Sequence, residues 1–249
     1  MALNPENNDT AISRLELVRS RISTAVFHRQ DANSEITLIA VGKGHSSEKI
    51  RELYALGIRD FAENYAQEYF RKKTELSDLT DIRWHFIGHL QSNKAKKVAQ
   101  TGCLIHGLDR SSLLEELIKS ADPSAPTKIL LQLQVDPTDT NKSGCSLAEA
   151  HELCAKISAA PGLLWEGFMG MGPADCPQDV LRMLYEKFMR NASQLWEKYS
   201  LRDPSRQLRP MKISLGMSDD LELAIRCGSN HIRIGSALFG ARPAKSQAT

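Results

Sequence analysis

Hydrophobic residues in this chain gather in short runs that alternate with longer segments of mixed polarity. In the longer segments, apolar residues recur every three or four positions, as Val180, Leu184, Phe188 and Leu195 do. A short apolar run predicts a buried strand, and the recurrence predicts an amphipathic helix. The strands expected on this basis span residues 36–42, 58–64, 83–88, 103–109, 128–135, 163–170, 211–217 and 231–235.

About eight strand-and-helix steps of this kind predict a parallel sheet that is covered by helices. We expect the closed (β/α)8 barrel, known as the TIM barrel, because eight such units in 249 residues match its usual size. An open, doubly wound sheet is the weaker alternative. We expect one domain over residues 1–249, with a frayed start at 1–10 and a tail at 243–249.

An extra helix is expected before the first strand. Ile12, Leu15, Val18, Ile22 and Val26 follow one another at three- and four-residue steps, which predicts an amphipathic helix over residues 11–29. This helix is expected to pack against the outside or the bottom of the domain.

Composition narrows the function classes. The formal net charge is +2 with both signs mixed along the chain, so the basic footprint of a dedicated nucleic-acid binder is missing. The five cysteines are widely spaced and match no zinc or redox motif, and no stretch is long and apolar enough to span a bilayer. We expect a cytoplasmic protein that binds neither nucleic acid nor membrane, with reduced thiols and no metal site.

Lys43 is the first candidate for chemistry. It ends the apolar run 36–42 and lies between Gly42 and Gly44, so its amine is expected to lose part of its hydration beside a core. Partial desolvation favours the neutral amine, which is the form that attacks an aldehyde. A lysine whose ammonium group reaches solvent at a strand end is the alternative interpretation.

Two turns near the end of the chain are candidate phosphate sites. The segment SLGMSDD at 214–220 and the segment RIGS at 233–236 each follow an apolar run and place glycine and hydroxyl residues before a helix. Free backbone N–H groups and the helix dipole bind anions at such turns, although Ser218 or Ser236 could also be simple helix caps. Barrels commonly seat a phosphate after their seventh and eighth strands, which favours the binding interpretation.

Several sequence blocks resemble one known family, the pyridoxal-phosphate homeostasis proteins, which are single-domain relatives of the barrel of alanine racemase. The resemblance covers residues 38 to 242. It rests on AVGK at 40–43, ENYAQE at 63–68, WHFIGHLQSNK at 84–94, KSG at 142–144, SLGMSDD at 214–220 and RIGSALFGAR at 233–242.

The resemblance implies the ligand and the roles of individual residues. By this likeness Lys43 carries pyridoxal 5'-phosphate as a reversible Schiff base, and Arg233 approaches the pyridine nitrogen. Asn64 lies near the ring. The phosphate is held by Ser214, Gly216, Gly235 and Ser236.

The chain departs from the family pattern at three places. Ala62 stands where the family usually has glycine, His45 and Ser46 replace a turn that usually carries lysine and proline, and the segment 169–173 is looser than the common form. The second departure puts any role of a second lysine beside Lys43 in doubt.

Three functions remain open on the sequence. The leading one is a non-catalytic protein that stores pyridoxal phosphate or delivers it to apo forms of enzymes that use it, and that acts as a monomer. The second is a small amino-acid racemase or decarboxylase with His85, His89 or Tyr65 as proton donor. We disfavour a racemase for two reasons. An arginine at the pyridine nitrogen leaves that nitrogen unprotonated, so the ring withdraws electrons poorly. We also expect no second domain after Arg242 to complete a racemase site. The third is a Schiff-base aldolase for a sugar phosphate.

Two basic features have simpler interpretations. Lys94, Lys96 and Lys97 are expected to form a solvated helix face rather than a site for RNA. Lys142 is expected in a loop at the mouth of the barrel, where the resemblance suggests that it helps to enclose the ligand.

Overall fold

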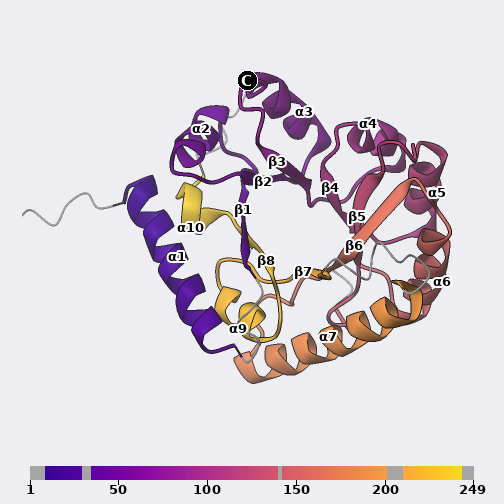
Figure 1. Ribbon diagram of the computed structural model, residues 1–249. Helices are drawn as coiled ribbons and strands as arrows, with labels where there is room; N and C mark the ends of the chain where they lie inside the picture. Colours follow the sequence, from indigo (N-terminus) through magenta and orange to yellow (C-terminus); the bar gives the residue numbers. More distant parts are fainter. Residues whose placement is uncertain (1–8, 30–34, 140–141, 201–209, 243–249) are drawn as a thin grey trace, which may run out of the picture.

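The computed structural model describes residues 9–29, 35–139, 142–200 and 210–242, and it confirms the predicted barrel (Figure 1). Eight parallel strands form one sheet in the order β7-β6-β5-β4-β3-β2-β1-β8. All eight predicted strands are present. They are β1 Thr37–Val41, β2 Asp60–Glu63, β3 Arg83–Phe86, β4 Leu104–Leu108, β5 Thr127–Gln132, β6 Leu163–Met169, β7 Lys212–Ser214 and β8 His231–Ile234.

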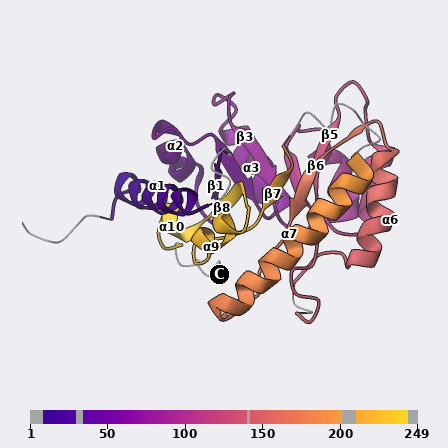
Figure 2. The same cartoon turned by 60° about the horizontal axis from the view of Figure 1, so that its bottom comes forward.

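Helices surround the sheet and connect its strands (Figures 1 and 2). The helical segments are α1 Ala11–Phe27, α2 Ser47–Ala55, α3 Ala66–Glu75, η1 Ser92–Lys94, α4 Ala95–Ala99, α5 Ser111–Lys119, α6 Leu147–Ser158, α7 Gln178–Ser200, α9 Leu221–Arg226 and α10 Ser236–Phe239. No helix within the described ranges is both long enough and apolar enough to cross a bilayer. The five cysteines, all of them in these ranges, form no disulfide.

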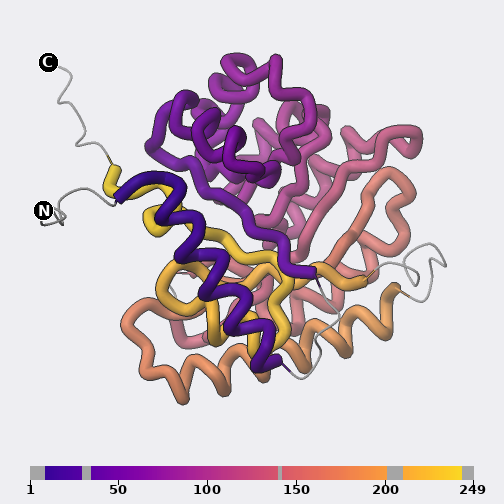
Figure 3. The backbone as a smooth tube through the Cα atoms, turned by 60° about the vertical axis from the view of Figure 1, so that its left-hand side comes forward, coloured from indigo at the N-terminus to yellow at the C-terminus, as the bar shows by residue number. Residues whose placement is uncertain are grey.

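The predicted N-terminal helix is confirmed as α1, which packs against α9 and α10 at the end of the chain (Figure 3). Arg21 Nε lies 2.6 Å from a carboxylate oxygen of Glu222 in α9. Arg14 Nε donates a hydrogen bond of 2.8 Å to the carbonyl of Leu238 in α10. The expectations for residues 1–8 and 243–249 fall outside the described residues.

The barrel closes where β7 meets β8, and this seam has little strand pairing. The Asn230 N–H donates to the Ile213 carbonyl at 3.1 Å, and the Arg233 N–H donates to the Gly216 carbonyl at 3.2 Å. The buried Ser229 hydroxyl adds contacts with the backbone of Ile213 and Leu215. Hydrogen bonds from side chains and turns therefore join β7 to β8, where backbone ladders join the other neighbouring strands.

The core has two parts. A large apolar cluster lies between the strands and the surrounding helices, and a small one, made of Leu104, Leu130 and Met169, is separate from it. His85 on β3 pairs in register with Leu104 on β4, and His106 lies two residues further along β4. Alternate residues of a strand face the same side, so Leu104 and His106 share one face of the sheet.

Candidate functional site

The sequence-predicted site residues lie at the carboxyl ends of several strands. Lys43 follows β1, Asn64 follows β2, Ser214 ends β7, and Gly235 follows β8. In a parallel barrel these ends open on one mouth. The structure therefore brings together residues that are far apart in the sequence.

Lys43 lies on a tight turn between Gly42 and Gly44, and its side chain is half-buried. The Nζ atom lies 5.2 Å from the centre of the Tyr65 ring. Gly44 has a φ of 76°, a conformation that glycine adopts without strain. The turn thus presents the amine of Lys43 beside an aromatic face.

The buried Lys72 of α3 binds the backbone of this turn. Its Nζ donates a hydrogen bond of 2.7 Å to the carbonyl of Gly42, and it lies 2.8 Å from Glu68 Oε1. Glu68 in turn accepts a bond of 2.9 Å from the Gly44 N–H. The residues on both sides of Lys43 are therefore fixed by one buried lysine and its carboxylate partner.

Glu63 completes this buried cluster. Its Oε1 lies 2.6 Å from Lys72 Nζ, and both side chains have no exposed area. Burial raises the pKa of Glu63 to about 7, although the positive charge of Lys72 acts in the opposite direction. Glu63 Oε2 has no hydrogen-bond partner within the described chain. A Cβ on Gly42 would lie 2.6 Å from Glu63 Oε1, so glycine is needed for this close approach.

Arg233 points into the barrel, as strand alternation predicts, and is almost fully buried. Its Nη1 donates to both the carbonyl and the hydroxyl of Ser214 at 2.6 Å, and its Nη2 donates to the Gly170 carbonyl at 2.9 Å. Burial lowers its pKa to about 10, so the group stays protonated at neutral pH. A guanidinium has five N–H donors, so hydrogens remain for a ligand beyond these three contacts.

The two predicted phosphate turns are present. Gly216 has a φ of 88°, and a Cβ there would lie 2.6 Å from Ala224. Helix α10 begins at Ser236, directly after Gly235, and the first N–H groups of a helix have no partner inside the helix. The buried Ser214 hydroxyl is already engaged with Arg233, so its contact with phosphate stays a prediction.

Asn64 is held at the mouth by its backbone. A Cβ on Gly88 would lie 1.9 Å from the Asn64 carbonyl oxygen, so β3 can end this close to β2 only with glycine. The Asn64 Oδ1 atom is buried and has no partner among the described residues. An unpaired buried oxygen costs free energy, and the predicted contact of Asn64 with a ligand ring stays a prediction.

Comparison with known proteins agrees with this geometry. Residues 25–243 match the family model for the N-terminal domain of alanine racemase. The pyridoxal phosphate homeostasis protein of Escherichia coli (strain K12) is 37% identical over 94% of this chain and 97% of its own. The protein of that name from Schizosaccharomyces pombe is 33% identical over 94% of both. This chain belongs to the pyridoxal phosphate homeostasis protein family.

Solved structures agree with this family assignment. PipY of Synechococcus elongatus PCC7942, with PLP bound, superposes with a TM-score of 0.79 at 33% identity, covering 93% of this chain and all of PipY. Alanine racemase from Bartonella henselae has a TM-score of 0.65 at 16% identity, which shows a shared fold.

The three proton donors considered for a racemase lie in different surroundings. Both ring nitrogens of His85 are engaged inside the barrel, with Asp60 and with His106. Tyr65 is exposed beside Lys43, and the exposed His89 lies 3.9 Å from Asp109. Of these three side chains, Tyr65 is the one that lies beside Lys43.

The departures from the family pattern have visible consequences. His45 is buried and stacks on the Phe239 ring of α10, with 4.8 Å between ring centres. Burial lowers the pKa of His45, so the ring is neutral at neutral pH. The turn after Lys43 is thereby attached to the helix that follows β8.

The basic features outside the site are also placed. Lys94, Lys96 and Lys97 are exposed, and Lys97 lies 4.4 Å from the centre of the Phe70 ring. Lys142 lies in a loop where its N–H donates to the Asp139 carbonyl at 3.3 Å.

Sequence reasoning missed Lys72 and His106. Lys72 lies three residues after Tyr69 and four before Leu76, so it shares the buried face of α3. That spacing, together with Glu68 four residues earlier, was the available signal. The corresponding signal for His106 was a histidine within an apolar strand run, as at His85.

Proposed function

We propose that this protein binds pyridoxal 5'-phosphate at the mouth of its barrel and serves in its homeostasis without catalysing a reaction of its own. The observation that carries the proposal is the placement of Lys43, whose amine stands on a fixed glycine turn at the same mouth as the buried Arg233. The relatives named for this role support it, as does the PLP-bound PipY structure.

The described residues fit this ligand. Lys43 offers a primary amine, and the turns at Gly216 and at Gly235 with Ser236 offer backbone N–H groups for a phosphate. Asn64 offers an amide whose buried Oδ1 atom has no partner among the described residues. The remaining hydrogens of Arg233 suit an acceptor such as a pyridine nitrogen. Ser214 orients Arg233 through its hydroxyl and its carbonyl.

When bound, pyridoxal phosphate supplies an aldehyde that condenses reversibly with a primary amine, with loss of water. The residues of this chain hold and release it. Arg233 stays protonated and donates a hydrogen bond, so it gives no proton to the ring nitrogen. A ring without that proton is a weak electron sink, which suits storage better than turnover.

Absence of catalysis is part of this proposal. Racemisation needs an acid or base on the substrate face opposite the lysine. His85 has both nitrogens engaged inside the barrel, and the Tyr65 ring lies 5.2 Å from Lys43 Nζ. We further propose that the protein is a cytoplasmic monomer and gives its ligand to apo forms of enzymes that depend on it.

Chemical trapping tests the site. Purified protein is incubated with pyridoxal phosphate, reduced with borohydride and mapped by peptide mass spectrometry. The phosphopyridoxyl group is expected on Lys43, and Lys43→Ala is expected to lose the visible absorbance of the adduct. Lys49→Ala is the matched control, because Lys49 is an exposed lysine just after the same turn. A group that remains elsewhere at wild-type level in Lys43→Ala would refute the assignment.

The same preparations test the two competing functions. A protein without a visible band, but with a borohydride-trapped sugar phosphate, would favour the aldolase. Incubation with single enantiomers of amino acids, followed by chiral chromatography, tests the racemase. We expect a rate no higher than that of free cofactor.

A further inference from the structure

A chain of buried polar side chains runs through the interior of the barrel from the mouth toward the opposite end. Arg233 Nη1 lies 2.6 Å from the Ser214 hydroxyl, which lies 3.1 Å from His106 Nδ1. His106 Nε2 lies 2.9 Å from His85 Nδ1, and His85 Nε2 lies 3.1 Å from Asp60 Oδ1. Five side chains from β2, β3, β4, β7 and β8 therefore form one connected path.

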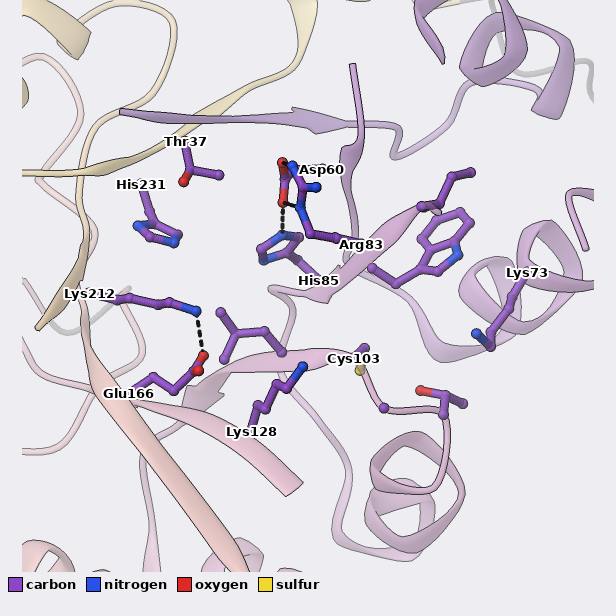
Figure 4. Close-up of a pocket in the computed structure, with 15 residues that line it drawn as sticks. Thr37, Asp60, Lys73, Arg83, His85, Cys103, Lys128, Glu166, Lys212 and His231 are labelled. Atoms are coloured by element: carbon purple, nitrogen blue, oxygen red, sulfur yellow. Dashed lines mark hydrogen bonds and ion pairs between the residues drawn. The ribbon is translucent and has the colours of Figure 1, made fainter. Parts of the chain in front are cut away.

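The path ends at the base of the barrel, where the strands begin. There Arg83 donates two hydrogen bonds to the carboxylate of Asp60, at 2.9 and 2.5 Å. Figure 4 shows this end of the path, with Asp60 between Arg83 and His85 at the edge of a cavity of about 330 Å³. The base of the barrel thus supplies a fixed carboxylate acceptor.

The two ends of the path determine where each hydrogen lies. Arg233 can only donate, so the Ser214 oxygen accepts from it, and the hydroxyl hydrogen is free for His106 Nδ1. His106 must then carry its proton on Nε2 and donate it to His85 Nδ1. His85 carries its own proton on Nε2 and donates it to Asp60. Both histidines are neutral, and both have the same tautomer.

The surroundings keep both rings neutral. Burial lowers the pKa of His106 well below its usual value, and the positive charges of Arg233 and Lys212, with the nearby His85 and His231, act in the same direction. Burial also lowers the pKa of His85, although Asp60 opposes this. Asp60 stays a carboxylate, because the bonds from His85 and Arg83 outweigh its burial and hold its pKa at about 2.

We propose that His106, held in one tautomer by His85 and Asp60, is a positioning residue that fixes Ser214 and through it the ligand-facing arginine, Arg233. The inference rests on the proposed function and goes beyond it, because it assigns the control of the ring-nitrogen contact to residues that touch no ligand. If His106 carried its hydrogen on Nδ1 instead, the Ser214 oxygen would accept from both His106 and Arg233, and the hydroxyl hydrogen would lose its acceptor on His106. The Ser214 oxygen would then be shared between two donors, and its bond to Arg233 would be less well oriented.

Two variants of His106 separate this role from simple space filling. The Oδ1 of His106→Asn can replace Nδ1 as the acceptor for Ser214, whereas His106→Leu has no acceptor. We expect His106→Leu to weaken pyridoxal phosphate binding about tenfold, the upper range for the loss of one hydrogen bond between neutral groups. We expect it also to shift the visible absorbance of the bound ligand. His106→Asn should remain within about threefold of wild type.

Variants at the base test whether the tautomer is set there. Asp60→Asn keeps the shape but allows the amide to donate toward His85, so it should weaken binding in the same direction as His106→Leu. Asp78→Asn is the matched control, because Asp78 also binds an arginine, Arg51, through both carboxylate oxygens, but on the surface. Equal binding by Asp60→Asn and wild type, or an equal loss in Asp78→Asn, would overturn the proposal.

A measurement without ligand provides an independent test. Nitrogen-15 NMR of histidine-labelled protein reports the tautomer of each ring, and we expect the Nε2–H form for both His85 and His106. An Nδ1–H form or a charged ring at neutral pH would overturn the inference. If His106→Leu does not fold, Asp60→Asn carries the test, because Asp60 lies at the end of the path opposite the mouth.

The outcomes also separate this inference from the proposed function. If wild type forms no adduct on Lys43, both fail. If wild type forms the adduct normally, and His106→Leu, folded, binds as tightly and with the same spectrum, then the inference alone fails.

Discussion

Lys72 is the residue on which the position of Lys43 depends most directly. Its charged group has no exposed area and is surrounded by Glu63, Glu68 and the carbonyl of Gly42. A buried ion pair adds little net stability compared with apolar residues, but removal of one partner leaves an uncompensated charge. The cluster of Lys72, Glu63 and Glu68 therefore mainly fixes the turn that carries Lys43, and loss of one member should lower the free energy of unfolding.

Lys72→Met is expected to lower the free energy of unfolding by about 3 to 5 kcal/mol, because it leaves Glu63 buried without its cation. Urea unfolding followed by circular dichroism measures this, with the neighbouring, half-buried Lys73→Met as control. Adding Glu63→Gln to Lys72→Met should recover part of the loss. Equal losses in Lys72→Met and Lys73→Met would contradict the role given to the cluster.

At the scale of residues, the orientation of a side chain could be predicted where the alternation along a single strand determined it. Alternation along β8 was sufficient to place Arg233 inside the barrel, and the confirmed strand order brings Lys43 to the same mouth. Lys72 and His106 could not be assigned because their burial depends on partners from other elements. The ligand contacts of Asn64, Ser214, Gly216, Gly235 and Ser236 stay predictions.

At the scale of elements, hydrophobic periodicity predicted every strand, although the strands are shorter than the apolar runs. The run expected at 211–217 gives a strand only at Lys212–Ser214. Gly216, with its positive φ, turns the chain away from the sheet directly afterwards. Apolar character continues past a strand end because residues of the turn, such as Leu215, are also buried.

Helix α1 stabilises the last two helical segments, and one pair of leucines tests this. Leu15 is 2% exposed and Leu17 is 63% exposed in the same helix. Leu15→Ala should lower the free energy of unfolding by about 2 to 5 kcal/mol, whereas Leu17→Ala should change it little. Chemical unfolding of both variants measures the difference, and a similar small effect in both would show that α1 is not part of the cooperative unit.

For the whole molecule, buried histidines should govern the response to acid. Burial lowers the pKa of His231 to about 3 and lowers the pKa of His85 and His106 as well. These rings are neutral in the folded state but become charged in the unfolded state below about pH 6.5. Stability is then lost as the pH falls, and His231 alone contributes about 1.4 kcal/mol per pH unit between its unfolded and folded pKa values. Glu63, with its raised pKa, acts in the opposite sense between about 4.5 and 7.

We therefore expect the free energy of unfolding to decrease from pH 6 to pH 4, since His85, His106 and His231, together with the buried His45, outweigh one glutamate. Urea unfolding at half-unit pH intervals measures the slope. His231→Gln, which cannot become charged, should reduce the slope by about 1.4 kcal/mol per pH unit if it folds. A profile that stays flat down to pH 4 would contradict the neutral, buried state of these rings.

The sparsely paired junction of β7 and β8 is where we expect the barrel to open locally most often. Amide hydrogens of Ile213 and Leu215 rest on single contacts with Asn230 and Ser229 rather than on a full ladder. Deuterium should enter there sooner than in the longer, well-paired β5 and β6. A ligand that contacts both the turn at Gly216 and the turn at Gly235 would link the ends of β7 and β8. Saturation with that ligand should slow deuterium uptake at this junction more than in the other strands.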